Sequence, residues 1–201
     1  MLMYKAIAFF LIVFCLFPTF AQDEEEVPIE EWDVEAPSLY TSGEQNFAIS
    51  VGLVLPLFFN GREGQTVNNV NAGSMLSLAY NYYLASHFFL GGEIGGMFAA
   101  TLGENMLYIV PFGLRIGYEF VLGRFEFPFS VMFGAATQKY LETDYFGFFL
   151  KPMVSIFFRF SPDWSFGLNS AWWIVPEWVS ESRKDITGHF LEITISVKYH
   201  F

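Results

Sequence analysis

The last eleven residues of the chain alternate strictly between apolar and polar side chains, and the alternation runs to the final residue. This stretch, residues 191–201, reads LEITISVKYHF. Successive side chains of a strand point to opposite faces, so the pattern predicts a strand with one apolar face and one polar face. Soluble domains rarely end on a phenylalanine within an unbroken alternating strand. The rest of the chain is therefore expected to supply strands that this one closes.

Seven earlier segments repeat the alternation. They cover residues 46–58, 72–84, 88–100, 106–120, 125–136, 145–160 and 164–175, and the closing strand covers residues 188–201. Short turns at 85–87, 122–124 and 161–163 alternate with longer polar connections at 60–70, 101–105, 137–144 and 176–187. An even strand count with this alternation suits a barrel in lipid, where only a closed sheet satisfies every backbone polar group. The prediction is an all-β fold, an eight-stranded antiparallel up-and-down transmembrane β-barrel over residues 46–201.

Two further patterns bear on this fold. Pro56, Pro111, Pro128 and Pro152 fall inside predicted strands, where proline removes a ladder donor. Pro56 is near a strand end, and bulges or curvature are expected at the other three. Aromatic residues gather at both ends of the predicted strands, as in the two aromatic belts of a membrane barrel. The expected belt at the short turns contains Tyr80, Tyr82, Phe88, Tyr118, Phe120, Phe125, Phe158, Phe160, Trp164, Tyr199 and Phe201; the belt at the longer connections contains Phe58, Phe59, Phe98, Tyr145, Trp172 and Trp178.

The beginning of the chain predicts export. Residues 1–21 contain a basic start, a short apolar run and a small residue at the cleavage position, the order of a secretory signal peptide. Residues 22–45 form an acidic, proline-containing segment that is expected to be a disordered periplasmic lead-in. An alternative interpretation is contact with a basic partner through Trp32 and its acidic neighbours.

Composition excludes several kinds of chemistry. The net charge is −11, and residues 23–35 alone contribute eight acidic groups and no basic one. Nucleic-acid binding therefore has no support. Cys15 is the single cysteine and lies in the predicted signal peptide, so the mature chain has no disulfide, thiolate metal site or cysteine nucleophile.

The polar faces of the predicted strands place eight charged side chains inside the barrel. We expect Glu93 to pair with Arg115, and Glu126 with Arg159, because each pair lies at a similar height on adjacent strands. Unpaired charges in a narrow lumen would be costly, so a salt-bridged plug is the favoured interpretation, with a gated conduit or binding niche as the alternative. The predicted network is Glu93, Arg115, Glu119, Glu126, Lys151, Arg159, Glu192 and Lys198.

The histidines do not predict an active site. His87 lies in a turn, His189 precedes Phe-Leu-Glu, and His200 is the penultimate residue. None has a serine two residues away on the same strand face, as nucleophilic catalysis from one strand would need. His189 and Glu192 are three residues apart and face opposite sides of a strand. We therefore expect no enzyme activity, no metal site and no cofactor.

The signal peptide, the eight alternating segments, the hairpin YNYYLASHFFLGGEIGG and the terminal VKYHF resemble the small eight-stranded outer-membrane proteins of the OmpW, OmpX and OmpA-barrel group. The similarity covers residues 46–201, and FAISVGLVLP is slightly similar to OmpW. The resemblance implies a C-terminal insertion signal at Val197, Tyr199 and Phe201. It also implies contact with outer-membrane lipids and the barrel-assembly machinery, and residence in the outer membrane of a diderm bacterium.

Three functions are compatible with this resemblance. The first is a structural or surface-interaction barrel, expected to be a monomer, whose lumen is largely plugged by salt bridges. The second is passive transport of a small hydrophobic solute, as associated with OmpW-type proteins. The third, less favoured, is lipid modification by an outer-membrane enzyme. An apolar, uncharged upper lumen would favour transport, whereas a charged plug spanning the lumen would favour the first function.

Overall fold

A computed structural model describes residues 40, 42–61, 64–66, 70–101, 106–140, 143–177 and 186–201. The predicted signal peptide, residues 1–21, lies outside this part of the chain, as does most of the predicted acidic segment, residues 22–45. Residues 35–201 form one compact unit. None of the described residues belongs to a helix that could span a membrane.

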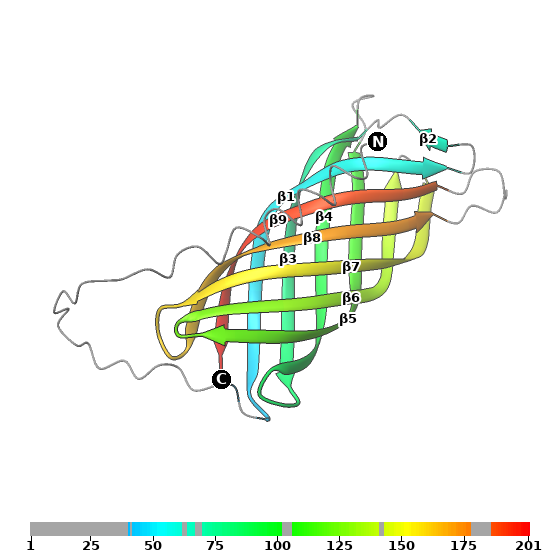
Figure 1. The fold of residues 1–201 in the computed structure, drawn as a ribbon. Helices are drawn as coiled ribbons and strands as arrows, with labels where there is room; N and C mark the ends of the chain where they lie inside the picture. The colour runs from blue at the N-terminus through cyan, green and yellow to red at the C-terminus, as the bar shows by residue number, and fades with distance from the viewer. Residues whose placement is uncertain are drawn as a thin grey trace. The chain divides into compact units, whose positions relative to one another are not determined.

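The described residues form a closed antiparallel barrel of eight long strands and one short additional strand. The eight long strands pair in sequence order, β2 pairs only with β1 among the described strands, and β1 also pairs with β9, which closes the barrel (Figure 1). The strands are β1 (Gln45–Gly61), β2 (Gly64–Thr66), β3 (Val70–Tyr83), β4 (Phe88–Thr101), β5 (Met106–Leu122), β6 (Phe125–Tyr140), β7 (Thr143–Arg159), β8 (Trp164–Glu177) and β9 (Ile186–His200). The predicted barrel fold is confirmed, and the C-terminal strand closes it by pairing with the first long strand.

Several predicted boundaries were wrong at the ends away from the short turns. The predicted polar connection at 137–144 is largely strand, because β6 continues to Tyr140 and β7 begins at Thr143. The predicted connection at 60–70 contains β2, which pairs with the end of β1. Polar residues in these stretches suggested loops. The backbone hydrogen bonds between neighbouring strands nevertheless extend beyond the segments in which apolar and polar side chains alternate. At the other end, Gly123 has a positive φ of 57° in the two-residue turn between β5 and β6.

The strand prolines are accommodated in two ways. The register between β1 and β9 shifts between Pro56 and Phe58, as expected for a bulge. Pro111, Pro128 and Pro152 each pair with one neighbouring strand, while the ladder on their other side is interrupted without a change of register. Of the bulges or curvature expected at these three described positions, a bulge is therefore absent. A missing N–H affects only the neighbour toward which it would have pointed.

The two faces of the sheet differ as the alternation predicts. In β5, exposed and buried residues alternate along nearly the whole strand. All eleven aromatic residues predicted for the belt at the short turns are exposed, and of the other belt Phe98 and Trp172 are exposed. Phe59 instead packs against the buried apolar cluster, while the side chain of Tyr145 and all of Trp178 lie outside the description. The barrel therefore presents an apolar outer surface.

Candidate functional site: the barrel lumen

All eight charged residues predicted for the lumen are buried inside the barrel. They form two groups, each with two acids and two bases. The middle quartet consists of Glu93, Arg115, Lys151 and Glu192, and the turn-end quartet consists of Glu119, Glu126, Arg159 and Lys198. Each quartet has a formal charge of zero, so neither needs a counter-ion from solvent.

Lys151 is the centre of the middle quartet. It lies halfway along β7, and its side chain is fully buried. Its ammonium contacts Glu93 and lies 3.3 Å from Glu192 Oε2, and Arg115 Nη1 lies 3.7 Å from Glu93 Oε2. Arg115 also donates from Nε to Ser130 Oγ at 3.0 Å. The expected Glu93–Arg115 contact thus occurs, but Lys151 connects Glu93 to an acid on another strand.

The turn-end quartet is built around Glu126. Arg159 Nε donates to Glu126 Oε1 at 2.7 Å, and Lys198 Nζ donates to Glu126 Oε2 at 2.8 Å. Lys198 Nζ also lies 3.3 Å from Glu119 Oε1, and Glu119 accepts a hydrogen bond from Tyr83. The expected Glu126–Arg159 pair is therefore one edge of a network that crosses four strands.

Buried ion pairs compensate for lost hydration only when their polar atoms also have good hydrogen-bond partners. Both quartets meet this condition through neutral groups: Ser130 in the middle quartet and Tyr83 in the turn-end quartet. The ammonium groups of two lysines also lie over aromatic rings. The ammonium of Lys151 is 5.0 Å from the Trp173 ring centre, and that of Lys198 is 4.2 Å from the Phe157 ring centre.

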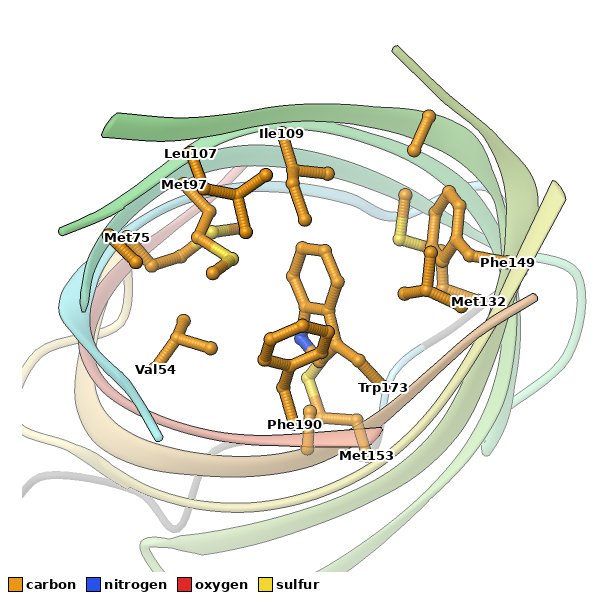
Figure 2. Packing of buried hydrophobic residues seen from close by; sticks show 14 residues of the cluster. Val54, Met75, Met97, Leu107, Ile109, Met132, Phe149, Met153, Trp173 and Phe190 are labelled. Carbon is orange, nitrogen blue, oxygen red and sulfur yellow. The ribbon is translucent and has the colours of Figure 1, made fainter. Parts of the chain in front are cut away.

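The part of the lumen nearer the longer connections is apolar. Figure 2 shows side chains from different strands pointing into the barrel, with Trp173 reaching toward its centre. Phe149 stacks beside Trp173 at 5.8 Å between ring centres. Trp173 also donates from Nε1 to Glu192 Oε2 at 2.6 Å, which joins this apolar cluster to the middle quartet. The buried cluster includes Val54, Met75, Met97, Leu107, Ile109, Met132, Phe149, Met153, Trp173 and Phe190.

Side chains fill the lumen almost completely at the level of the charges. A cavity there is lined by residues of both quartets, among them Glu93, Arg115, Glu119 and Lys198, and its volume is about 10 Å³. A cavity needs about 10–15 Å³ to hold one water molecule. This space therefore accommodates at most a single water, as an eight-stranded barrel with a side-chain-filled interior would.

The sequence did not predict the apolar cluster. In the halves of the strands that form this cluster, both faces carry apolar side chains, so the polar face cannot be recognised. In residues 146–150, FGFFL, both faces carry apolar side chains, so Phe149 gives no sign that it points inward. Extending the period from Lys151 would have placed Phe149 on the inner face. The same extension from Glu93 identifies Met97.

The structure also brings together a serine and a histidine that the sequence separates. Ser165 Oγ lies 2.8 Å from His200 Nε2, because β8 and β9 are paired neighbours. Glu126 lies on the same side of this histidine, 3.7 Å from Nε2, whereas Nδ1 faces Tyr40 and Arg159. A catalytic triad instead needs an acid on the other ring nitrogen to orient the base. Ser165 is also completely buried. The geometry therefore supplies neither an oriented base nor access for a substrate.

The other histidines are held in different surroundings. His87 Nδ1 lies 2.8 Å from the backbone oxygen of Glu119, and the ring of His189 stacks on Phe58 at 4.3 Å. Among the described residues, no group of three or more potential ligands could hold a metal ion. The absence of enzyme activity and of cofactors, expected from the sequence, remains a prediction.

The three residues of the predicted insertion signal lie on the outer surface of β9 and at the chain end. Val197, Tyr199 and Phe201 are all exposed, and the rings of Tyr199 and Phe201 stack at 5.8 Å. Tyr199 also contacts Trp164 of the neighbouring strand at 4.8 Å between ring centres. This places the terminal aromatic residues in the turn-end belt.

Comparison with known proteins places this chain among relatives from spirochaetes. An uncharacterized protein of Treponema pallidum is 29% identical over 129 residues, which cover 64% of this chain and 59% of that protein. The chain thus spans less than two thirds of the Treponema relative. An uncharacterized protein of Borreliella burgdorferi is 23% identical over 180 residues, covering 79% of this chain and 82% of that protein.

Solved structures identify the fold. The crystal structure of the outer membrane protein OprG from Pseudomonas aeruginosa matches with a TM-score of 0.53 and 11% identity, covering 81% of this chain and 97% of OprG. A protein-family model matches residues 23–199. The match to OprG agrees with the fold of this chain, in which the β1–β9 pairing closes a barrel with an apolar outer surface. The chain belongs to the family whose model spans residues 23–199, and its fold is the closed eight-stranded β-barrel of small outer-membrane proteins such as OprG.

Proposed function

We propose that this protein is a closed outer-membrane barrel with a structural or surface-interaction role, and that its lumen passes neither ions nor solutes. The filled interior supports this proposal. Two charge-balanced quartets and an apolar cluster succeed one another along the barrel, and the cavity beside the charges holds no more than about one water. A barrel without a passage interacts with its surroundings through its outer surface and its rim.

Single-channel recording in planar bilayers tests this proposal directly. The mature protein, Arg115→Ala and Glu93→Ala are compared, and heat-modifiable migration on a gel verifies that each is folded. Silence from all three is expected, because the turn-end quartet and the apolar cluster remain in both variants. Conductance of the unmodified protein would overturn the proposal. Conductance that appears only when Arg115 or Glu93 is removed would instead establish a conduit gated by the middle quartet.

Passive transport of a small hydrophobic solute is the second candidate, and the apolar cluster favours it. Met75, Met97 and Phe149 line the lumen on the side of the longer connections without a charge among them. The test is equilibrium binding of radiolabelled indole to the protein in nanodiscs, with empty nanodiscs as the baseline. Saturable binding that Trp173→Ala alters would support transport, and a signal equal to that of empty nanodiscs would exclude indole as a ligand.

The route to the membrane is part of the same proposal. We infer cleavage after Ala21, export through the inner membrane of a diderm bacterium, and recognition of Val197, Tyr199 and Phe201 by the barrel-assembly machinery. Support comes from the pairing of β9 with β1, which makes the terminal strand the one that closes the barrel. Phe201→Ala should slow assembly in cells while leaving spontaneous refolding in detergent nearly unchanged. Equal rates of assembly in cells would contradict this assignment.

A further inference from the structure

One residue that precedes the first strand lies inside the barrel. The sequence suggested that residues 22–45 were a disordered lead-in, yet Tyr40 is only 2% exposed and packs with Tyr83 and Phe89. Gln45 already belongs to β1. Tyr40 therefore contributes a side chain to the turn-end mouth of the lumen from outside the sheet.

A tight turn at Gly43 lies between Tyr40, in the mouth of the lumen, and the start of β1. Gly43 has a φ of 101°, a backbone conformation that glycine adopts readily and other residues rarely do. Its N–H donates to the carbonyl oxygen of Tyr83 at 2.9 Å, and the N–H of Tyr83 donates to the carbonyl oxygen of Glu44 at 2.9 Å. Gly43 and Glu44, just before β1, are thus attached to the end of β3.

The Tyr40 side chain occupies a cradle made by three strands. Its ring stacks on that of Tyr83 in β3, with 3.9 Å between centres and 6° between planes. The guanidinium carbon of Arg159 in β7 lies 4.9 Å from the ring centre, and the hydroxyl lies 3.3 Å from His200 Nδ1 in β9. Burial raises the pKa of the Tyr40 hydroxyl well above its usual value, so this group remains a protonated donor.

These contacts cover the turn-end quartet without being part of its charge balance. The bonds that Arg159 and Lys198 make to Glu126 do not involve the Tyr40 side chain. The barrel wall also does not depend on Tyr40, because Asn46 and the residues after it pair directly with β3 and β9. Withdrawing this one side chain would consequently open the mouth while leaving both the sheet and the ion pairs in place.

We propose that Tyr40 is a removable plug, supplied by the segment before β1, that seals the turn-end mouth of the lumen and keeps water away from the turn-end quartet. Short turns face the periplasm in barrels of this class. The plug therefore limits the hydration of the lumen from the periplasmic side. The inference goes beyond the closed-barrel function, because it assigns the seal at this end to a side chain that is not part of the sheet.

Cysteine accessibility tests the plug, and the mature chain offers a cysteine-free background. Ser165→Cys places a thiol at a completely buried position beside His200, the residue that the Tyr40 hydroxyl contacts. A small, water-soluble methanethiosulfonate reagent should label it slowly in the otherwise unchanged protein and at least tenfold faster with Tyr40→Ala. Tyr40→Phe, which keeps the stacked ring, should remain close to the slow rate, and Gly43→Ala should give an intermediate rate because it strains the turn.

A second thiol separates loss of the plug from general loosening of the barrel. Ala171→Cys lies at a buried position in the apolar cluster, and its labelling rate should be the same with Tyr40 and with Tyr40→Ala. Equal rates for Ser165→Cys with and without Tyr40 would overturn the proposal, as would a parallel increase at both thiols. The result is independent of conductance, because the mouth can open to a small reagent while the lumen beyond it stays closed.

Discussion

The turn-end part of the lumen and the part nearer the longer connections are filled in different ways. The turn-end quartet satisfies each buried charge through a specific partner, as when Lys198 bridges Glu119 and Glu126. The apolar cluster fills space with flexible or flat side chains such as Met97 and Trp173. The middle quartet lies at the border, and Trp173 contacts both kinds of filling.

This difference teaches that the two parts should respond to mutation by different rules. A charge in a closed lumen depends on the identity of its partner, because an uncompensated buried ion is costly. An apolar side chain depends on volume, because its contribution comes from close contact with its neighbours. Charge deletions should therefore be rescued by deleting the partner, and apolar truncations by restoring bulk.

The largest effect is expected at Lys151. Lys151→Met keeps most of the side-chain volume but leaves Glu93 and Glu192 without their shared base, which should cost about 3–5 kcal/mol of unfolding free energy. Urea unfolding in detergent micelles, followed by tryptophan fluorescence, measures this loss. The double variant Lys151→Met/Glu192→Gln restores the charge balance and should recover much of the loss. A double variant as unstable as the single one would show that the charge-pairing rule does not apply to the middle quartet.

A smaller loss of unfolding free energy is expected from truncating Met97 in the apolar cluster. This side chain is buried opposite Met75 on the paired strand, and Met97→Ala should cost about 2–3 kcal/mol. The value lies toward the lower end for such truncations because flexible methionine neighbours can partly fill the space. Met97→Leu serves as the volume-preserving control and should stay within about 1.5 kcal/mol of the unmodified protein. A larger loss with leucine than with alanine would contradict packing by volume.

The smallest changes in unfolding free energy are expected at two buried serines on neighbouring strands, and they should differ between the two. Ser155 Oγ has no hydrogen-bond partner in the described part of the chain, so Ser155→Ala should be neutral or stabilising by up to about 1 kcal/mol. Ser130 accepts a bond from Arg115 Nε, and Ser130→Ala should cost about 1–3 kcal/mol because a charged donor loses its acceptor. The same unfolding assay compares the two variants. Equal changes in unfolding free energy would mean that having a hydrogen-bond partner does not decide how much a hydroxyl in this lumen stabilises the fold.

Sequence patterns were most informative where the two strand faces differ. The segments around Arg115 and Glu192 alternate clearly, and both side chains were placed correctly in the interior. Prediction failed where that contrast was weak or where partners came from distant strands. Phe149 has apolar neighbours on both sides, while the proximity of Ser165 and His200 depends on the register between β8 and β9.

The sequence alone determined that this chain is a closed barrel with an apolar outside and charges inside, because a strand has a period of two and lipid tolerates no open sheet edge. Only the tertiary structure decided how the interior is divided. Alternation along one strand specifies a face, but it does not specify which side chains meet across the lumen. The partners of Lys151, the central position of Trp173 and the entry of Tyr40 into the mouth depend on closure, since closure brings residues from distant strands within contact distance.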